Sequence, residues 1–161
     1  MDHQQGIGSS FNISAATWFP QPTANLSGTI AVNTGCLVIG TGTAFRSQLS
    51  PGDWILVPGS NEIQQIFSID DDTTLHLFKP FEATVTTPAA STYQRIKNEG
   101  LKEMQVTFIT SAGTIRGSSQ LTTAGASVPA ALTIPFKYSG RLDPQLITPG
   151  GGGTAFVFTV I

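Results

Sequence analysis

Short apolar runs separated by turn-forming residues dominate the chain from Leu26 onward. The first two runs, 28–32 and 36–39, flank Asn33-Thr34-Gly35, which suits a tight hairpin because Asn and Gly tolerate a positive φ. Runs of this length are too short for most helices, and the 17 Gly and 10 Pro among 161 residues interrupt helices further. The sequence therefore predicts an all-β fold.

Residues 26–98 carry further runs that have the length and alternation of strands. Within 62–69 the alternation breaks at Ile66, which indicates a strand with a bulge or bend. Pro51-Gly52 fits the central positions of a type II turn, and Asp70-Asp71-Asp72 favours a turn between strands. The further strands are expected at 53–57, 62–69, 74–78 and 92–97. Short strands at this spacing predict a small barrel-like module.

Residues 99–161 are expected to form a second module, a β-sandwich or jelly-roll-like half, after a joint at Asn98-Glu99-Gly100. Its expected strands are 104–109, 131–138 and 155–161. The segments 118–129 and 141–153 are rich in turn residues and are predicted to be loops. Gly150–Gly153, followed by a strand rather than a helix, is interpreted as a flexible hairpin loop.

Residues 1–25 are polar, rich in Gly and Ser, and interrupted by prolines, so we expect an extended N-terminal arm. Phe11, Trp18 and Phe19 are large apolar residues in this arm, and they must pack either on their own module or on a neighbouring subunit. Aromatic side chains are enriched where interfaces hold most of their binding energy. Phe11, Trp18 and Phe19 are therefore the predicted partner-binding residues.

The charge of the chain is low and slightly negative, with 11% charged residues and a formal net charge of −2. Its eight Lys and Arg are spread singly, which argues against nucleic acid as a partner. The first six residues lack the basic and apolar regions of a secretory signal. No segment approaches the roughly 18 apolar residues that span a bilayer, so no membrane partner is expected.

Residues that carry chemistry are sparse and poorly grouped. His3 lies in the arm, His76 alternates with leucines, and Cys36 sits in an apolar run as a small buried residue would. One Cys and two His do not make a Cys/His zinc site, and Asp70-Asp71-Asp72 lacks the spacing of a calcium loop. Nothing singles out a catalytic pair among Asp53, Glu62, Glu82, Glu99 and Glu103. We expect no enzymatic activity, cofactor or metal.

One stretch of the sequence, residues 28–81, resembles a module of bacteriophage virion proteins that occurs in tail-fibre, baseplate and head-decoration components. The matching residues are Gly28-Thr29-Ile30, Val32, Gly40-Thr41-Gly42-Thr43-Ala44-Phe45, Leu49, Pro51-Gly52-Asp53-Trp54-Ile55, Ile66, Ser68-Ile69, Asp72-Thr73-Thr74-Leu75, Leu77 and Pro80-Phe81. The resemblance covers about a third of the chain. It implies a small β module that serves as a building block, without catalytic residues.

A short chain with an arm and two β halves is similar to a head decoration (cement) protein, which binds the capsid lattice and stabilises it. This similarity implies the major capsid protein or other virion proteins as partners. It also implies a homo-oligomer, such as a trimer or a symmetric cluster on a capsid axis. The expected location is the virion, after assembly in the host cytoplasm.

Two alternative functions remain open at this point. The first is a short tail component, such as a tube, adaptor or fibre-base protein. The second is a host-glycan-binding module in which exposed aromatic residues stack on sugar rings, with Trp18, Phe19, Trp54 and Tyr93 as candidates. Trp54 lies inside an apolar run and is expected in the core, whereas Trp18-Phe19-Pro20 lies outside any run and is the better candidate for an intermolecular contact.

Overall fold

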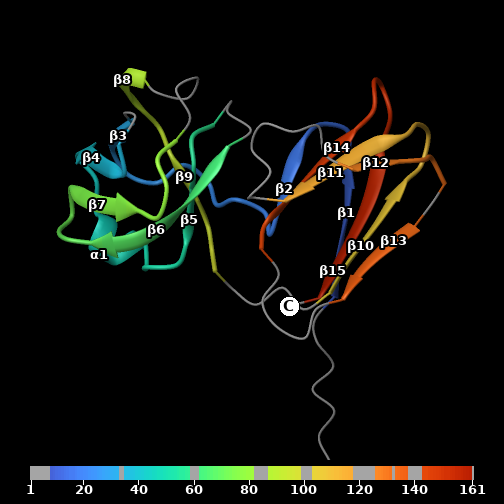
Figure 1. Cartoon of the computed structure of the whole chain (residues 1–161), viewed down its shortest axis with the longest axis horizontal. Helices are drawn as coiled ribbons and strands as arrows, with labels where there is room; N and C mark the ends of the chain where they lie inside the picture. Colours follow the sequence, from blue (N-terminus) through green and yellow to red (C-terminus); the bar gives the residue numbers. More distant parts are fainter. Residues whose placement is uncertain are drawn as a thin grey trace, which may run out of the picture. The chain divides into compact units, whose positions relative to one another are not determined.

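The computed structural model describes residues 8–32, 35–58, 62–81, 87–98, 103–117, 126–131, 133–137 and 143–160. These ranges contain fifteen strands and one four-residue helix (Figure 1), which confirms the predicted all-β fold. The chain divides into two compact units. The barrel unit is Gln21–Asn98, and the sandwich unit combines Met1–Pro20 with Glu99–Ile161. The division after Asn98 falls within the joint that the sequence indicates.

The barrel unit is built on a seven-stranded antiparallel sheet in the order β8-β3-β4-β7-β6-β5-β9. Its elements are β3 (Thr29–Val32), β4 (Leu37–Thr41), α1 (Phe45–Gln48), β5 (Trp54–Leu56), β6 (Ile63–Ile69), β7 (Thr74–Leu77), β8 (Thr87–Ser91) and β9 (Gln94–Ile96). The predicted hairpin is confirmed as β3 paired with β4, although its turn residues 33 and 34 lie outside the described residues. The predicted bulge is confirmed by a register shift between Ile66 and Ser68. Neither α1 nor β8 was predicted.

The sheet of the barrel unit curls round on itself (Figure 1). β8 and β9 stand at opposite ends of the strand order, but only Thr92 and Tyr93 separate them in the chain. Because the three Cα–Cα steps from Ser91 to Gln94 span at most about 11 Å, the two ends of the sheet must come close together. Residues 23–26, which precede β3, cover the free edge of β9. There Thr23 N donates to Arg95 O (2.8 Å) and Leu26 N donates to Tyr93 O (2.9 Å).

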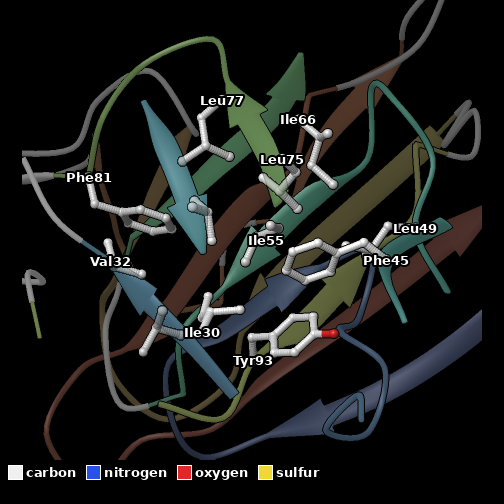
Figure 2. Packing of buried hydrophobic residues seen from close by; sticks show 12 residues of the cluster. Ile30, Val32, Phe45, Leu49, Ile55, Ile66, Leu75, Leu77, Phe81 and Tyr93 are labelled. Atoms are coloured by element: carbon white, nitrogen blue, oxygen red, sulfur yellow. The ribbon is translucent and has the colours of Figure 1, made fainter. Parts of the chain in front are cut away.

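The core of the barrel unit lies inside this curl (Figure 2). Phe45 from α1 and Tyr93 are fully buried and meet edge to face, with ring centroids 5.7 Å apart. The Tyr93 hydroxyl donates to Ser27 O at 3.0 Å, which satisfies its polar atom. Burying side chains of this size contributes about 1.5–3 kcal/mol each. The short helix α1 is therefore the element that supplies a central aromatic residue.

The sandwich unit consists of two four-stranded sheets, β1-β15-β10-β13 and β12-β11-β14-β2. Its strands are β1 (Gly8–Ile13), β2 (Thr17–Phe19), β10 (Glu103–Phe108), β11 (Gly113–Gly117), β12 (Ala126–Val128), β13 (Thr133–Lys137), β14 (Gln145–Pro149) and β15 (Ala155–Val160). Buried residues from both sheets form one cluster, to which Phe108, Ile115, Ile147 and Val157 belong. The two sheets therefore share a single core. The predicted strands 104–109, 131–138 and 155–161 are confirmed as β10, β13 and β15.

The N-terminal segment differs from the predicted extended arm. Over residues 8–13 it pairs with β15, from Gly8 opposite Val160 to Ile13 opposite Ala155, and β2 pairs with β14. In β1 exposed Ser10 and Asn12 alternate with partly buried Phe11 and buried Ile13. The N-terminal segment is therefore an integral part of the sandwich unit. Its backbone adds one strand to each of the two sheets, and its apolar side chains pack in the core.

Two predicted loops also contain strands. β12 lies within 118–129, and β14 lies within 141–153 between β11 and β2. Leu146 and Ile147 of β14 are both buried, and this strand supplies the backbone partners of its two neighbours. Pro149 and the glycines after it obscured the strand, because proline and glycine clusters normally indicate loops. β11 was not predicted.

Gly150–Gly153 is not a hairpin loop. It connects β14 to β15, which belong to different sheets, and Gly153 N donates to Gly150 O at 2.7 Å. A Cβ atom on Gly150 would lie 2.1 Å from Ala112 O, and one on Gly153 would lie 1.9 Å from Ser111 Oγ. Gly150 therefore packs closely against the backbone of Ala112, which leaves no room for a side chain, and Gly153 packs against the Ser111 side chain.

Candidate interaction surface

Residues 28–81 supply most of the core of the barrel unit. Gly28 has a φ of +75°, and a Cβ atom there would lie 2.4 Å from the carbonyl carbon of Gly42. Thr43 Oγ1 donates to Asp72 O at 2.6 Å, and Phe45 is completely buried. The Gly-Thr-Gly-Thr-Ala-Phe stretch therefore provides a close backbone contact, a tertiary hydrogen bond and a core side chain.

The Pro51-Gly52-Asp53 stretch forms a turn held by the buried carboxylate of Asp53. Asp53 N donates to Ser50 O at 3.0 Å, and Gly52 has the positive φ, 92°, that a type II turn requires. The Asp53 carboxylate accepts from Ser50 N (3.0 Å) and Asn98 N (2.9 Å), and Arg95 Nε lies 3.6 Å away. The carboxylate connects this turn to the end of the barrel unit. The side chains of Thr43 and Asp53 therefore stabilise the fold through hydrogen bonds within the barrel unit.

The predicted partner-binding residues pack within their own unit. Phe19 is 1% exposed in the sandwich core, and Phe11 packs against it with ring centroids 5.5 Å apart. Trp18 is 3% exposed, and its buried Nε1 has no hydrogen-bond partner. The extended-arm interpretation of these residues is therefore corrected: β1 and β2 are integral strands, so Trp18 and Phe19 are buried and Phe11 is partly buried.

The other described residues that were considered for stacking or metal binding pack in the barrel unit or form its turns. Tyr93 is a core residue, whereas Trp54, expected in the core, is only half-buried on β5. The Asp71 carboxylate accepts from the amide (2.7 Å) and the hydroxyl of Thr73, and these hydrogen bonds lower the pKa of Asp71. Asp70–Asp72 is a turn, as predicted. His3 lies outside the described residues.

Two of the five carboxylates considered for catalysis have described side chains. Asp53 is bonded as above, and buried Glu62 accepts a hydrogen bond from Gln64 Nε2 at 2.8 Å. Glu82 and Glu99 lie outside the described residues, as does the side chain of Glu103. Within the part of the chain that the structure describes, no group of three or more His, Cys, Asp and Glu side chains is placed to hold a metal ion.

A large apolar patch lies on the outer face of the curled sheet, over strands β4, β7 and β6. It consists of Leu37 (38% exposed), Ile39 (44%), Phe67 (58%) and Phe78 (58%), and we call it the outer apolar patch. The rings of Phe67 and Phe78 meet edge to face, with centroids 5.1 Å apart. Leu37 pairs with His76, two residues before Phe78, so the residues from the three strands lie close together.

Strand register explains why this patch is exposed. Val38 and Leu75 point into the core, so their neighbours Leu37, Ile39 and His76 point outward. The bulge in β6 adds Phe67 to the same surface. The Nε2 atom of His76 lies 3.1 Å from Asp70 Oδ2, so a polar pair borders the apolar side chains.

A second apolar face lies on the outside of the sandwich sheet that contains β10 and β15. It is formed by Ile109 (50% exposed), Phe156 (37%) and the half-buried Phe158. Phe156 lies opposite Asn12 on one side and Thr107 on the other. We call these three apolar residues the sandwich face. Their neutral polar neighbours suit docking against another protein surface.

Sequence reasoning missed both surfaces, although β4 contained a signal. Its run Cys36-Leu37-Val38-Ile39 is apolar at successive positions, which is typical of a strand that is covered on both sides. In the structure only one side of β4 is covered by the core. Large exposed apolar side chains gathered on one sheet face are characteristic of interaction sites.

Among the described residues, no helix combines the length and the apolar character that crossing a bilayer requires. Both exposed faces consist of apolar side chains that carry no charge. No family model, curated protein or solved structure matches this chain.

Proposed function

We propose that this chain is a non-enzymatic structural protein of a bacteriophage particle, which binds the head surface as a decoration (cement) protein. The observation that carries the proposal is the presence of an exposed apolar sheet face on each of the two units. A protein that stabilises a lattice has to hold at least two neighbours, and two separate docking faces meet that requirement. The resemblance of residues 28–81 to virion modules supplies the phage context.

The use of polar groups in the barrel unit supports a structural role. Asp53 bonds to backbone amides and Arg95, and Thr43 bonds to a backbone carbonyl. Catalysis requires a nucleophile or base that is aimed at a substrate. These buried groups instead stabilise turns, as expected of a module that serves as a building block.

The partner of the proposed protein is the major capsid protein, and its location is the virion. A short tail component, such as a tube, adaptor or fibre-base protein, is the alternative within the same structural class. The glycan-binding alternative loses its first candidate residue, because Trp18 is buried in the sandwich unit. A test of glycan binding should therefore change exposed aromatic residues of the sheet faces, such as Phe67 and Phe78, instead of Trp18.

Antibody labelling of purified particles, viewed by electron microscopy, tests the proposal. Label distributed evenly over heads is expected, whereas label confined to tails selects the tail alternative. Absence of label from every particle overturns the virion assignment. Particles that lack the protein should also release their genome at lower temperature and after milder osmotic shock, and unchanged resistance overturns the cement role.

Add-back of the purified chain to such particles tests the sandwich face. An Ile109→Ser/Phe156→Ser variant should bind at least about tenfold more weakly, because interface energy concentrates in a few apolar anchors. Ala126→Ser, at an exposed position on β12 of the same unit, is the matched control and should bind normally.

A further inference from the structure

We infer that the outer apolar patch of the barrel unit binds a second copy of this chain, through a two-fold contact that places Asp70 of each copy against Lys79 of the other. The inference goes beyond the proposed function, because it concerns the isolated chain and requires no phage particle. Three observations carry it: the exposure of the patch, the distribution of charge around it, and its size.

Exposure of the patch is concentrated on two aromatic rings that stand beside one another. Phe67 and Phe78 are each 58% exposed and contact one another at a centroid distance of 5.1 Å. Leu37 and Ile39 of β4 extend the apolar surface across β7. Aromatic side chains in such a group are the residues that most often anchor an interface.

Charges of opposite sign lie at the two ends of β7, which crosses the patch. The turn before β7 carries Asp70, Asp71 and Asp72, all exposed, and exposed Lys79 follows Phe78 at the other end. Asp70 Oδ2 lies 3.1 Å from His76 Nε2, so the Asp70 carboxylate borders the outward face of β7.

One basic side chain reduces the negative charge of this turn without cancelling it. The Arg46 guanidinium donates to Asp70 O, and Arg46 N donates to Asp72 Oδ1 (3.0 Å). Three carboxylates against one guanidinium leave the turn acidic. The two ends of β7 therefore differ in sign, and this difference makes the patch complementary to a rotated copy of itself.

Complementarity of this kind selects the orientation of the second copy. If two patches meet face to face with a two-fold axis across β7, the acidic end of each strand lies over the basic end of the other. If the axis runs along β7, like charges meet and oppose the contact. The apolar side chains then provide the attraction, and the Asp70–Lys79 contacts determine the register.

The size of the patch predicts a weak dimer. A strand of five residues is about 17 Å long, and three strands spaced by about 4.8 Å cover about 14 Å. This footprint is well below the roughly 800 Å² per partner of a standard stable interface. The dimer should therefore form in the micromolar to millimolar range.

Analytical ultracentrifugation of the full chain from about 1 μM to about 1 mM tests the inference. A concentration-dependent monomer–dimer equilibrium is expected, and Phe67→Ser/Phe78→Ser should raise its dissociation constant at least about tenfold. Ala126→Ser, at an exposed position of the sandwich unit, is the control and should leave it unchanged. A chain that stays monomeric throughout overturns the inference, as does a dimer that the Phe67/Phe78 variant leaves intact.

A charge-exchange experiment tests the orientation. Lys79→Glu and Asp70→Lys should each weaken self-association, because both symmetry-related contacts then join like charges. An equimolar mixture should recover association, because one contact is reversed in sign and the other is native. Native mass spectrometry measures the mixed dimer, and circular dichroism checks that each variant is folded. Failure of the mixture to recover overturns the proposed two-fold arrangement.

Discussion

Thr43 and Asp72 lie 29 residues apart in the chain, and the Thr43 hydroxyl donates to Asp72 O at 2.6 Å. The same carbonyl accepts from Phe45 N at 3.2 Å, so one oxygen joins the turn before β7 to the start of α1. This hydrogen bond therefore links two turn segments that are distant in the sequence.

Removal of this hydroxyl should produce a modest loss of stability. Thr43→Val is expected to lower the free energy of unfolding by about 1 kcal/mol, because the Phe45 amide still satisfies the carbonyl. Thr41→Val, at an exposed position of β4, is the control and should change it little. Urea unfolding followed by circular dichroism measures both. Equal losses in the two variants would contradict the role of the tertiary hydrogen bond.

Gly28 and Gly42 should respond very differently to alanine, although both have a positive φ. At Gly28 a Cβ atom would lie 2.4 Å from backbone, so Gly28→Ala should cost about 3 kcal/mol or more. At Gly42 the nearest atom is 3.8 Å away, and only the strained φ remains, at about 1 kcal/mol. Thermal unfolding compares the variants, and similar melting temperatures would contradict the close backbone approach.

Asp53 should be the most sensitive carboxylate in the barrel unit. Asp53→Ala leaves the amides of Ser50 and Asn98 without their acceptor and removes the neighbour of Arg95. The expected loss is about 2–3 kcal/mol, since hydrogen bonds to charged groups are stronger than neutral ones. The exposed Asp143→Ala is the control, with little expected effect. A denaturant midpoint that Asp53→Ala leaves unmoved would falsify this role.

Alkaline pH should destabilise the barrel unit through Tyr93. Burial raises the pKa of Tyr93 from 10.0 to about 12. The folded state therefore keeps the phenol proton at pH values where the unfolded chain loses it, so this stability is fully present below about pH 10 and is lost toward about pH 12. The loss should reach about 2 kcal/mol, measured by urea unfolding from about pH 9 to about pH 11.5.

Tyr93→Phe is the control for this pH dependence. The variant lacks the hydrogen bond to Ser27 O, so its stability at neutral pH should fall by about 1 kcal/mol. Its midpoint should then decline less steeply with pH than that of the wild type. Parallel curves for the two proteins would exclude Tyr93 as the titrating group.

Trp18 should behave as a core residue. Trp18→Ala is expected to lower stability by about 3–5 kcal/mol, because the side chain is almost completely buried. Trp18→Phe should cost much less, because it keeps most of the apolar area and removes an Nε1 donor that has no acceptor. Urea unfolding of the sandwich unit measures both variants. Normal stability of Trp18→Ala would contradict the burial of Trp18 and support an exposed position in an extended arm.

Local sequence patterns were sufficient to predict most strands of the barrel unit. Alternating apolar residues and turn-forming pairs such as Pro51-Gly52 act within a few residues of the chain, so they indicate β3 to β7 and β9 without tertiary information. The break at Ile66 likewise predicted the bulge in β6. The prediction that Phe11, Trp18 and Phe19 lie in an extended arm was wrong, because the strands that pair with this segment are distant in the sequence.

The sequence by itself determined that this chain folds as β-strands joined by turns, because alternation and turn chemistry are local properties. Only the tertiary structure decided that residues 8–19 belong to the sandwich, since β1 and β2 find their backbone partners in β15 and β14, over a hundred residues away. It also decided which apolar residues remain exposed. Leu37 and Val38 are equally apolar neighbours, and the curl of the sheet buries only the one that points inward.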